Sequence, residues 1–372
     1  MIEPVTENKA KPAGIREIAN ALGISIGTVD RALHGRSGVS AKTRAKVLQM
    51  AESLQYRPNI AARNLKLNRR IRLAVHLPQQ IASFFDPLRD GIRAAALAAH
   101  SLNVEMDFKT FPRLGTGDRE LLEKDLNRGY DGIILTPGDP SIIGPIIGRF
   151  TDQGTAVFCV ASDAPRTSRL AAISVDATAS GGIAAELLAR TIRAQGTVAT
   201  ITGNLSTLDH SEKLRGFAAT LATLAPHLTL IPAIESHERP KDAQQAILTL
   251  LDRKPRPLGL YVSTANSLPV LRVLEERRLL DHIHVITTDL FPELIPLLES
   301  GKILATLYQR PFTQGKVAFE TLTQFLVDGA RPDEFTRLAP HIVLRSNLHL
   351  FSGRLTLQSD TIMGSRDRES SG

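Results

Sequence analysis

The sequence predicts a small all-α N-terminal head, a short hinge segment, and a large α/β domain of two doubly wound lobes. Three observations predict this fold class. Apolar residues recur at helical spacing near the N-terminus, and after residue 71 short buried strands alternate with amphipathic helices. About 290 residues of the second pattern exceed one comfortable hydrophobic core, which favours two lobes.

The head is predicted to be a helix-turn-helix domain of three short helices. Gly23 ends the first helix, while Ser25 and Ser40 are N-cap residue types that begin the second and third. Three sets of apolar residues have helical spacing and would face one core: Ile15, Ile18, Ala19 and Leu22; Val29, Ala32 and Leu33; and Val47, Ala51 and Leu54.

The charge of the head indicates that it binds double-stranded DNA. Residues 1–70 hold 13 Lys and Arg against five Asp and Glu, a net charge of +8, whereas the whole chain carries +7, so the remainder carries −1. Positive charge confined to one small domain is typical of a surface that contacts phosphates. Ile26, Gly27 and Arg31 point away from the predicted core and are the candidate base-reading residues.

Three runs in this region resemble the lactose-repressor (LacI/GalR) family of bacterial transcription regulators. They are Ile-Ala-x-x-x-Gly-Ile-Ser-x-x-Thr-Val-x-Arg-Ala-Leu from Ile18 to Leu33, Val-Ser-x-Lys-Thr-Arg-x-Lys-Val from Val39 to Val47, and Tyr56-x-Pro58-Asn59. The resemblance continues over nearly the full length of the chain. It implies a DNA-binding head joined to an effector-binding domain with the fold of periplasmic sugar-binding proteins.

The resemblance also implies roles for individual residues of the head. Ile26, Gly27 and Arg31 would contact bases, and because the first two offer no side-chain hydrogen bonds, polar readout would depend on Arg31, bidentate to a guanine. The residues implied to contact phosphates are Ser25, Thr28, Ser40 and Thr43. Asp30 stands where many members have a small polar residue, and it either pairs with a neighbouring basic side chain or opposes the phosphate backbone.

The segment after Pro58 is too short to form a stable helix alone. In the resembled family this hinge folds when two copies meet over the operator centre. The resemblance places Asn59, Ala62 and Leu65 in the minor groove, with Leu65 as an apolar wedge that opens a base step. A plain linker is the alternative.

The large domain reads as two parallel sheets covered by helices, with a helix expected at 88–102. The strand candidates are 72–77, 104–110, 132–136, 156–161, 172–175, 197–202, 229–236, 259–263, 284–288, 305–309 and 342–344. Ligands of such folds bind between lobes at the carboxyl ends of the strands.

Most of the pocket residues that the resemblance implies follow directly after a predicted strand. They are Phe84, Phe85, Asp86, Asp139, Asp163, His210, Ser211, Lys213, Asn266, Asp289 and Gln309. Carboxylates and amides around an aromatic wall suit a polyhydroxylated ligand, so we expect a sugar or sugar derivative. For Asp86 and Asp139 a helix N-cap is an equally weighted alternative.

One departure from the family leaves the ligand class open. Ser211 stands where many sugar-binding relatives carry an arginine that binds ring hydroxyls, with Asp209, His210 and Lys213 as substitutes beside it. A sugar acid, a polyol or a purine therefore remains an alternative to a neutral sugar.

Enzyme signatures are missing from the sequence. It has no G-x-x-x-x-G-K-[ST] loop, no H-E-x-x-H and no G-x-S-x-G, and its single cysteine, Cys159, lies in an apolar strand. We therefore expect no enzyme activity, no cofactor and no metal. No run resembles a signal peptide or a membrane span, so we expect a cytoplasmic protein with no membrane partner.

These expectations give one domain plan and one function. The plan is a disordered tail at 1–12, the DNA-binding domain at 13–57, the hinge at 58–70, the effector domain at 71–358 and a disordered tail at 359–372. Lobe 1 would comprise about 71–175 and 310–338, and lobe 2 about 176–309 and 339–358. The expected function is a ligand-responsive transcription regulator, a repressor as most members are, binding a near-palindromic operator as a homodimer. The alternative from another class is a cytoplasmic sugar-binding protein with a helical interaction module.

Overall fold

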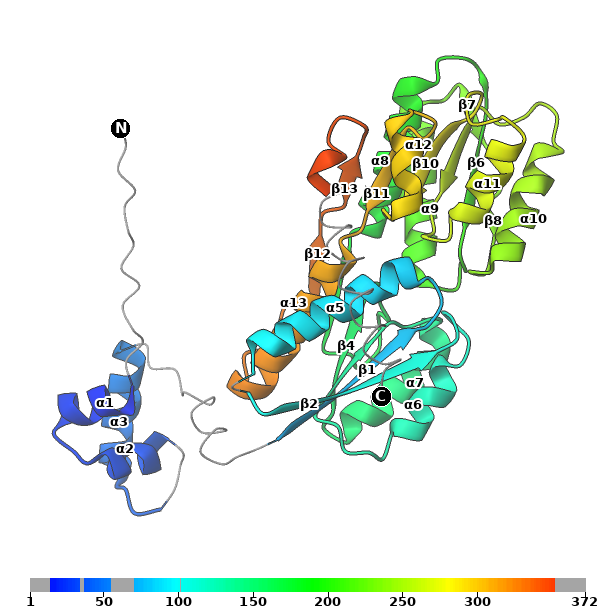
Figure 1. Cartoon of the computed structure of the whole chain (residues 1–372). Coiled ribbons are helices and arrows are strands. Elements are labelled where there is room, and N and C mark those ends of the chain that lie inside the picture. Colours follow the sequence, from blue (N-terminus) through cyan, green and yellow to red (C-terminus); the bar gives the residue numbers. More distant parts are fainter. Residues whose placement is uncertain (1–13, 34–36, 55–69, 101, 352–372) are drawn as a thin grey trace, which may run out of the picture. The chain divides into compact units, whose positions relative to one another are not determined.

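The computed structural model describes residues 14–33, 37–54, 70–100 and 102–351. The chain forms two compact units, which are described separately: a head, and a body that begins at Arg70. Figure 1 shows the head as three helices and the body as two α/β lobes. None of the helices in these ranges has the length and apolar character needed to cross a membrane.

The head contains the three predicted helices, α1 (Ile15–Leu22), α2 (Ile26–Leu33) and α3 (Ala41–Ser53). Gly23 ends α1 in the left-handed conformation, at φ 63°. The apolar residues with helical spacing meet in one core whose fully buried members are Ile18, Ala19, Val29, Ala32, Val47 and Ala51. The remaining predicted core residues are partly buried against it, so the predicted head is confirmed.

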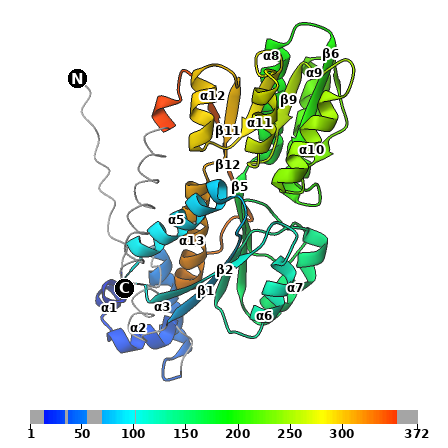
Figure 2. The same cartoon turned by 45° about the vertical axis from the view of Figure 1, so that its right-hand side comes forward.

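The first lobe is built on a six-stranded sheet with the order β12-β5-β4-β3-β1-β2, in which all neighbours are parallel. Its strands are β1 (Ile71–Pro78), β2 (Val104–Phe111), β3 (Gly132–Leu135), β4 (Ala156–Val160), β5 (Ala171–Val175) and β12 (Phe335–Leu338). Its helices are α5 (Ala82–Ala98), α6 (Asp118–Asp125), α7 (Pro140–Asp152) and α13 (Pro311–Asp328). Figures 1 and 2 show α5 and α13 side by side, with α6 and α7 grouped together elsewhere on the lobe.

The second lobe repeats this plan around a sheet with the order β13-β11-β10-β9-β6-β7, where β8 also pairs with β6. Only β13 runs antiparallel among the paired strands. Its strands are β6 (Gly196–Thr202), β7 (Leu228–Leu230), β8 (Ile234–Glu235), β9 (Gly259–Val262), β10 (His284–Thr288), β11 (Ala305–Tyr308) and β13 (His341–Val343). Its helices are α8 (Ala177–Thr191), α9 (Leu208–Leu224), α10 (Pro240–Leu251), α11 (Leu268–Glu276), the 3-10 turn η1 (Pro292–Leu294) and α12 (Ile295–Glu299).

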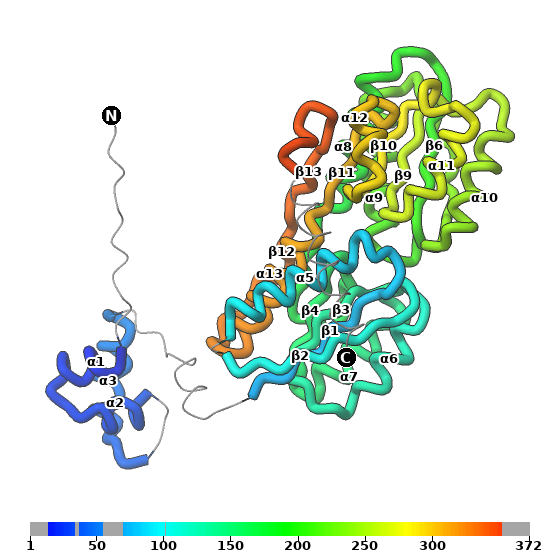
Figure 3. Tube along the Cα trace, viewed as in Figure 1, coloured from blue at the N-terminus to red at the C-terminus, as the bar shows by residue number. Residues whose placement is uncertain are grey.

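The chain passes from one lobe to the other at three places in the described residues. It crosses between β5 and α8, between β11 and α13, and between β12 and β13. Each crossing is short, and the trace in Figure 3 shows all of them on the side where the two sheets approach each other. The carboxyl ends of the parallel strands in both lobes therefore come together at one level.

Three sequence expectations differ from this fold. The helix expected at 88–102 begins earlier, at Ala82, because Phe84 and Phe85 bury their rings there, and Pro87 is accommodated inside it. The single strand expected at 229–236 is two short strands, β7 and β8, pairing with different parts of β6. The strand β12 was not expected, because its half-exposed residues carry no clear alternation of apolar and polar side chains.

Reciprocal glycines set how closely a helix pair packs in each lobe. A Cβ on Gly181 of α8 would lie 1.8 Å from the carbonyl oxygen of Lys213 on α9, and one on Gly216 of α9 would lie 2.1 Å from that of Thr178. In the first lobe, Gly91 and Gly315 bring α5 and α13 together in the same way, with contacts of 2.0 Å. The atom that an added Cβ would overlap is a backbone carbonyl oxygen at each position, so a side-chain rotation cannot relieve the overlap.

We predict that Gly181→Ala destabilises the body despite the better helix propensity of alanine. Overpacking typically costs about 1–3 kcal/mol, and it exceeds the roughly 1 kcal/mol that alanine contributes in a helix. The matched control is Gly148→Ala in α7, where an added Cβ meets nothing within 4 Å. Thermal unfolding should show a lower midpoint for Gly181→Ala and an unchanged or higher midpoint for Gly148→Ala. Equal midpoints for the two variants would mean that the α8–α9 contact is not tight.

Candidate functional site

The first candidate site is the outer face of α2 in the head. Ile26, Gly27 and Arg31 are all exposed, and Ile26 leaves 49% of its surface in contact with solvent. The structure therefore places the three predicted base-reading residues together on one exposed face.

The four predicted phosphate-contact residues form two identical motifs at helix starts. Ser25 Oγ accepts from the backbone N–H of Thr28 at 3.1 Å and lies 2.8 Å from Thr28 Oγ1. Ser40 and Thr43 repeat this at the start of α3 with the same two distances. Each pair caps its helix and presents hydroxyls beside the positive end of the helix dipole, where anions are favoured.

The remaining expectations for DNA contact lie beyond what the structure describes. Asn59, Ala62 and Leu65, expected in the minor groove, fall outside the described residues. Asp30 is half-buried on α2.

The second candidate site is a cavity lined by both lobes at the carboxyl ends of their strands. It encloses about 40 Å³, which is more than a single water molecule needs. The first lobe contributes Ile81, Phe84, Phe85, Leu114, Thr136, Ala161 and Ser162. The second lobe contributes Thr207, Asp209, His210, Lys213, Glu238, Thr264, Ala265 and Gln309.

The two walls of this cavity differ in chemistry. The first lobe supplies an apolar wall, in which the buried rings of Phe84 and Phe85 pack edge to face with centroids 4.9 Å apart. The second lobe supplies nearly all the charged groups. A ligand held here would place an apolar face on one lobe and polar groups on the other.

Lys213 is the central charged group of the polar wall. Its side chain is fully buried, and its Nζ donates to Asp209 Oδ2 at 2.6 Å and to Gln309 Oε1 at 2.8 Å. Burial opposes the charge, but the carboxylate of Asp209 outweighs it, so the pKa of Lys213 is raised. An ammonium has three donors, which leaves one for a ligand.

Gln309 is held in place by Asp289, which lies behind it. The Asp289 carboxylate accepts from the Gln309 backbone N–H at 3.0 Å and from Nε2 at 2.6 Å. This bond turns the amide so that its Oε1 faces Lys213. Burial raises the pKa of Asp289 to about 6, against the opposing effect of Lys213 and the two Gln309 bonds.

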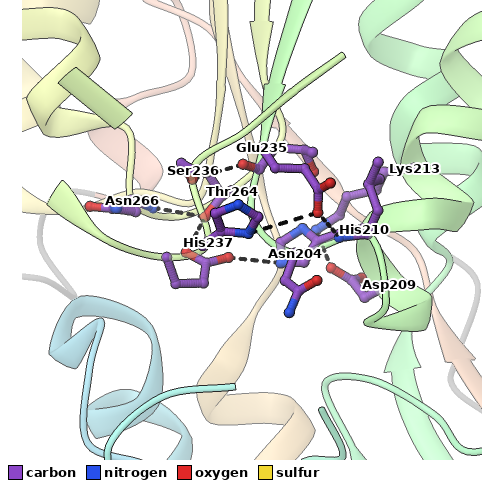
Figure 4. A network of polar contacts seen from close by, with 12 residues as sticks. Asn204, Asp209, His210, Lys213, Glu235, Ser236, His237, Thr264 and Asn266 are labelled. Carbon is purple, nitrogen blue, oxygen red and sulfur yellow. Dashed lines mark hydrogen bonds and ion pairs between the residues drawn. The ribbon is translucent and has the colours of Figure 1, made fainter. Parts of the chain in front are cut away.

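His210 and Glu238 form a second polar pair across the cavity. His210 Nε2 lies 2.8 Å from Glu238 Oε1, and Thr264 Oγ1 donates to the other carboxylate oxygen at 2.7 Å. Gly203 permits the pair to lie against the backbone, because a Cβ there would be 1.8 Å from Glu238 Oε1. Figure 4 shows His210, Asp209 and Lys213 projecting from one helix toward the loops that carry Thr264 and Asn266.

Four residues that line the cavity each carry a buried polar atom with no hydrogen-bond partner among the described residues. The atoms are Thr136 Oγ1, Ser162 Oγ, Thr207 Oγ1 and His210 Nδ1, two from each lobe. Buried polar atoms in proteins are almost always paired. These four groups therefore suit a ligand rich in hydroxyl groups.

The structure brings some of the expected pocket residues together and places others elsewhere. Phe84, Phe85, His210, Lys213 and Gln309 line the cavity. Phe84, Phe85 and Asp86 occupy the first turns of α5 rather than a loop.

Six expected pocket residues do not line the cavity, and each has another contact. Asp86 pairs with the buried Arg89 at 2.7 Å. Asp139 caps α7 by accepting from Ser141 N, which is the alternative weighed for it. Ser211 Oγ donates to the carbonyl of Leu208 on its own helix. Asp289 supports Gln309 from behind, and the backbone N–H of Asn266 donates to Thr264 Oγ1.

The sixth, Asp163, lines a neighbouring cavity of about 400 Å³. Both of its oxygens are engaged by Arg169, one at 2.9 Å, so it acts mainly as the partner of a buried guanidinium.

Several lining residues were absent from the expected set. Glu238 reaches the cavity because two successive residues, His237 and Glu238, have left-handed backbone conformations at φ 48° and 56°. No sequence pattern predicts this conformation. Thr136 directly follows β3, and Ser162 lies two residues after the end of β4, so their position after a strand could have identified them. Asp209 was expected only as a substitute for the arginine that many sugar-binding relatives carry at the position of Ser211.

Two other expectations concern chemistry at this site. Burial raises the pKa of the Cys159 thiol to about 12, as suits an inert core residue. The described ranges hold no group of three or more His, Cys, Asp or Glu that could bind a metal ion.

Comparison with known families matches both units of the chain. Residues 14–59 match the lacI family of bacterial regulatory proteins, and residues 73–330 match the periplasmic binding protein domain. Catabolite control protein A from Priestia megaterium is 24% identical over 321 residues, which is 84% of this chain and 92% of that protein. The same protein from Streptococcus mutans is 36% identical over 78 residues, 21% of this chain and 23% of that protein.

Solved structures resemble the body. GanP, a glucose-galactose binding protein from Geobacillus stearothermophilus, has a TM-score of 0.69 and 25% identity, covering 75% of this chain and 99% of its own. A solute binding protein from Agrobacterium vitis with bound D-fucose has a TM-score of 0.70 over 76% of this chain and 99% of its own; at 18% identity it shows the fold alone. With a lacI-type head and a periplasmic-binding-protein body in one polypeptide, homologous over most of its length to catabolite control protein A, the chain belongs to the LacI family of bacterial regulatory proteins.

Proposed function

We propose that this protein is a ligand-responsive repressor that binds a near-palindromic operator as a homodimer, with a sugar or sugar derivative as its effector. The observation that carries the proposal is the joining, in one chain, of an exposed reading face on α2 to a cavity ringed by unpartnered hydroxyls and a histidine nitrogen. GanP, which is named as a glucose-galactose binding protein, supports the same ligand class. The protein would act in the cytoplasm, by binding alone and without catalysis.

The two walls of the cavity suggest how the ligand acts on DNA. Because each lobe supplies half of the contacts, a bound ligand favours the arrangement of lobes in which both halves reach it. The head joins the body at the start of β1, in the first lobe, so in a homodimer a change in lobe arrangement would change the distance between the two copies of β1. The ligand shifts the operator affinity only by its differential affinity for the two arrangements.

Selection of bound sequences from a random DNA pool, with and without a panel of sugars, tests the whole proposal. A near-palindromic site whose recovery changes with one compound supports a ligand-responsive regulator. A sugar-binding protein whose head contacts another protein would enrich no sequence, even at low salt.

We predict that Arg31→Ala relaxes base preference at one position of each operator half-site. Loss of a bidentate contact to guanine should cost about 1–3 kcal/mol at that base pair and little elsewhere. The matched control is Arg16→Ala, which removes the same charge from an exposed position on α1. Binding is measured on the selected operator and on its single-base variants; an equal loss on all of them would make Arg31 a phosphate contact.

We predict that Asp289→Asn weakens effector binding without unfolding the protein. A carboxylate accepts from both donors of Gln309, whereas an amide has one acceptor oxygen, so one donor of Gln309 would face another donor. Gln309 then no longer holds its Oε1 toward Lys213. Titration calorimetry with the effector should show at least a tenfold loss of affinity at neutral pH, with the unfolding midpoint changed by only a few degrees. Wild-type affinity in this variant would remove Asp289 from the supporting role.

We predict that effector affinity falls as the pH is lowered through about 6, the pKa of Asp289. Below that pH the carboxyl is protonated and accepts only one of the two Gln309 donors, while above it both bonds are present. The groups acting on Asp289 are Lys213, Gln309 and Asp209. Affinity is measured between pH 5 and 8 (roughly one unit below to two above this pKa) for the wild type and Asp289→Asn. The variant should be weak throughout, without the wild-type step; the same step in both proteins would assign it to another group.

A further inference from the structure

The ligand cavity adjoins the second, larger cavity of about 400 Å³. Ala161, Ser162 and Asp209 line both, so the two share one boundary. The second cavity extends toward the crossing between β5 and α8, and it receives residues from both lobes. Its further lining residues are Asp163, Pro165, Ser174, Val175, Asp176, Ala177, Thr178, Leu208, Glu212, Arg215, Phe335 and Arg337.

Each charged group discussed in the second cavity has a contact within the protein. Arg215 forms an ion pair with Glu212, and Asp163 forms one with Arg169 behind the wall. Asp176 caps α8 by accepting from Ala179 N at 2.8 Å. The Arg337 guanidinium lies over the ring of Phe335, 4.8 Å from its centroid. The surface is therefore polar and offers both donors and acceptors.

The boundary between the cavities carries a polar atom that needs a partner. Ser162 is 4% exposed, lines both cavities, and its Oγ has no hydrogen-bond partner among the described residues. A ligand confined to one cavity would end at this boundary. A ligand that extends through both cavities would pass alongside Ser162.

The balance of charge argues against an acidic ligand. Across the two cavities the lining carboxylates are Asp163, Asp176, Asp209, Glu212 and Glu238, whereas the lining cations are Lys213, Arg215 and Arg337. Lys213 and Arg215 are each bound to one of those carboxylates. A phosphate or carboxylate on the ligand would meet more negative than positive side chains, and two of the three cations already have a carboxylate partner.

We propose that the effector is a neutral saccharide of more than one ring, with one ring against Phe84 and Phe85 and the next in the second cavity, the linkage passing Ser162. This inference rests on the proposed function and narrows its ligand class. It selects neutral oligosaccharides over monosaccharides and over the sugar acids that the sequence left open.

Titration calorimetry on the full chain tests this with maltose, cellobiose, trehalose, lactose and sucrose, each compared with its component monosaccharides. We expect at least one disaccharide to bind at least tenfold more tightly than either of its components. Glucuronic acid and glucose 6-phosphate, as acidic probes, should bind more weakly than glucose.

Two variants then locate the second ring. Ala177→Phe fills the second cavity from the start of α8, and Arg337→Ala removes a polar group from its wall. Each should reduce the ratio of disaccharide to monosaccharide affinity at least fivefold. The matched control for the arginine is Arg190→Ala, whose residue pairs with Glu186 on the exposed face of α8 and should leave the ratio unchanged.

Equal affinity for disaccharides and monosaccharides, or a ratio that neither variant changes, would overturn the inference while leaving the proposed regulator intact. Preference for an acidic probe would also overturn it. If no saccharide binds, the inference and the sugar effector both fail. Operator selection in the absence of ligand then reports separately on the DNA-binding part of the proposed function.

Discussion

The site depends on the buried ammonium of Lys213. A charge in a protein interior is costly unless it is paired and hydrogen-bonded, and Lys213 meets this requirement through Asp209 on its own helix and Gln309 at the end of β11. Gln309 can serve only because Asp289, at the end of β10, orients its amide. The carbonyl of Lys213 is also the atom that Gly181 of α8 packs against. One residue thus connects the α8–α9 crossing, through its backbone, to the carboxyl ends of two neighbouring strands, through its side chain.

The parts of the fold that follow from periodic patterns could be predicted from the sequence. Strands such as β3 and β4 are continuous apolar runs, and the helices of the head have regular apolar spacing, so both were predicted close to their observed bounds. Patterns fail where tertiary contacts decide the structure. The start of α5 is set by the burial of Phe84 and Phe85, and the two residues of β8 are too few to show any alternation.

The candidate site was predictable in its location and less so in its members. Strand ends could be identified, but a carboxylate after a strand either caps the next helix or faces the ligand, and only the backbone direction distinguishes these. Asp139 caps a helix, whereas Glu238 reaches the cavity through two left-handed residues. Asp289 shows a third outcome, since it supports a residue that lines the cavity. Sequence spacing is the same for all three roles, because the difference arises from φ and ψ values within the loops.

The division of unpartnered atoms between the lobes bears directly on how a ligand could switch the protein. Thr136 and Ser162 belong to the first lobe, and Thr207 and His210 to the second. A neutral hydrogen bond contributes about 0.5–1.5 kcal/mol, so satisfying all four atoms at once would contribute on the order of 2–6 kcal/mol. Reversing a two-state equilibrium from 1:99 to 99:1 needs about 5.5 kcal/mol of differential affinity. A ligand that reached only one lobe would gain half of these bonds in either arrangement and would shift nothing. A ligand whose hydroxyl groups reach both lobes at once therefore favours one arrangement of the lobes. Through that arrangement it changes the affinity of the head for its operator.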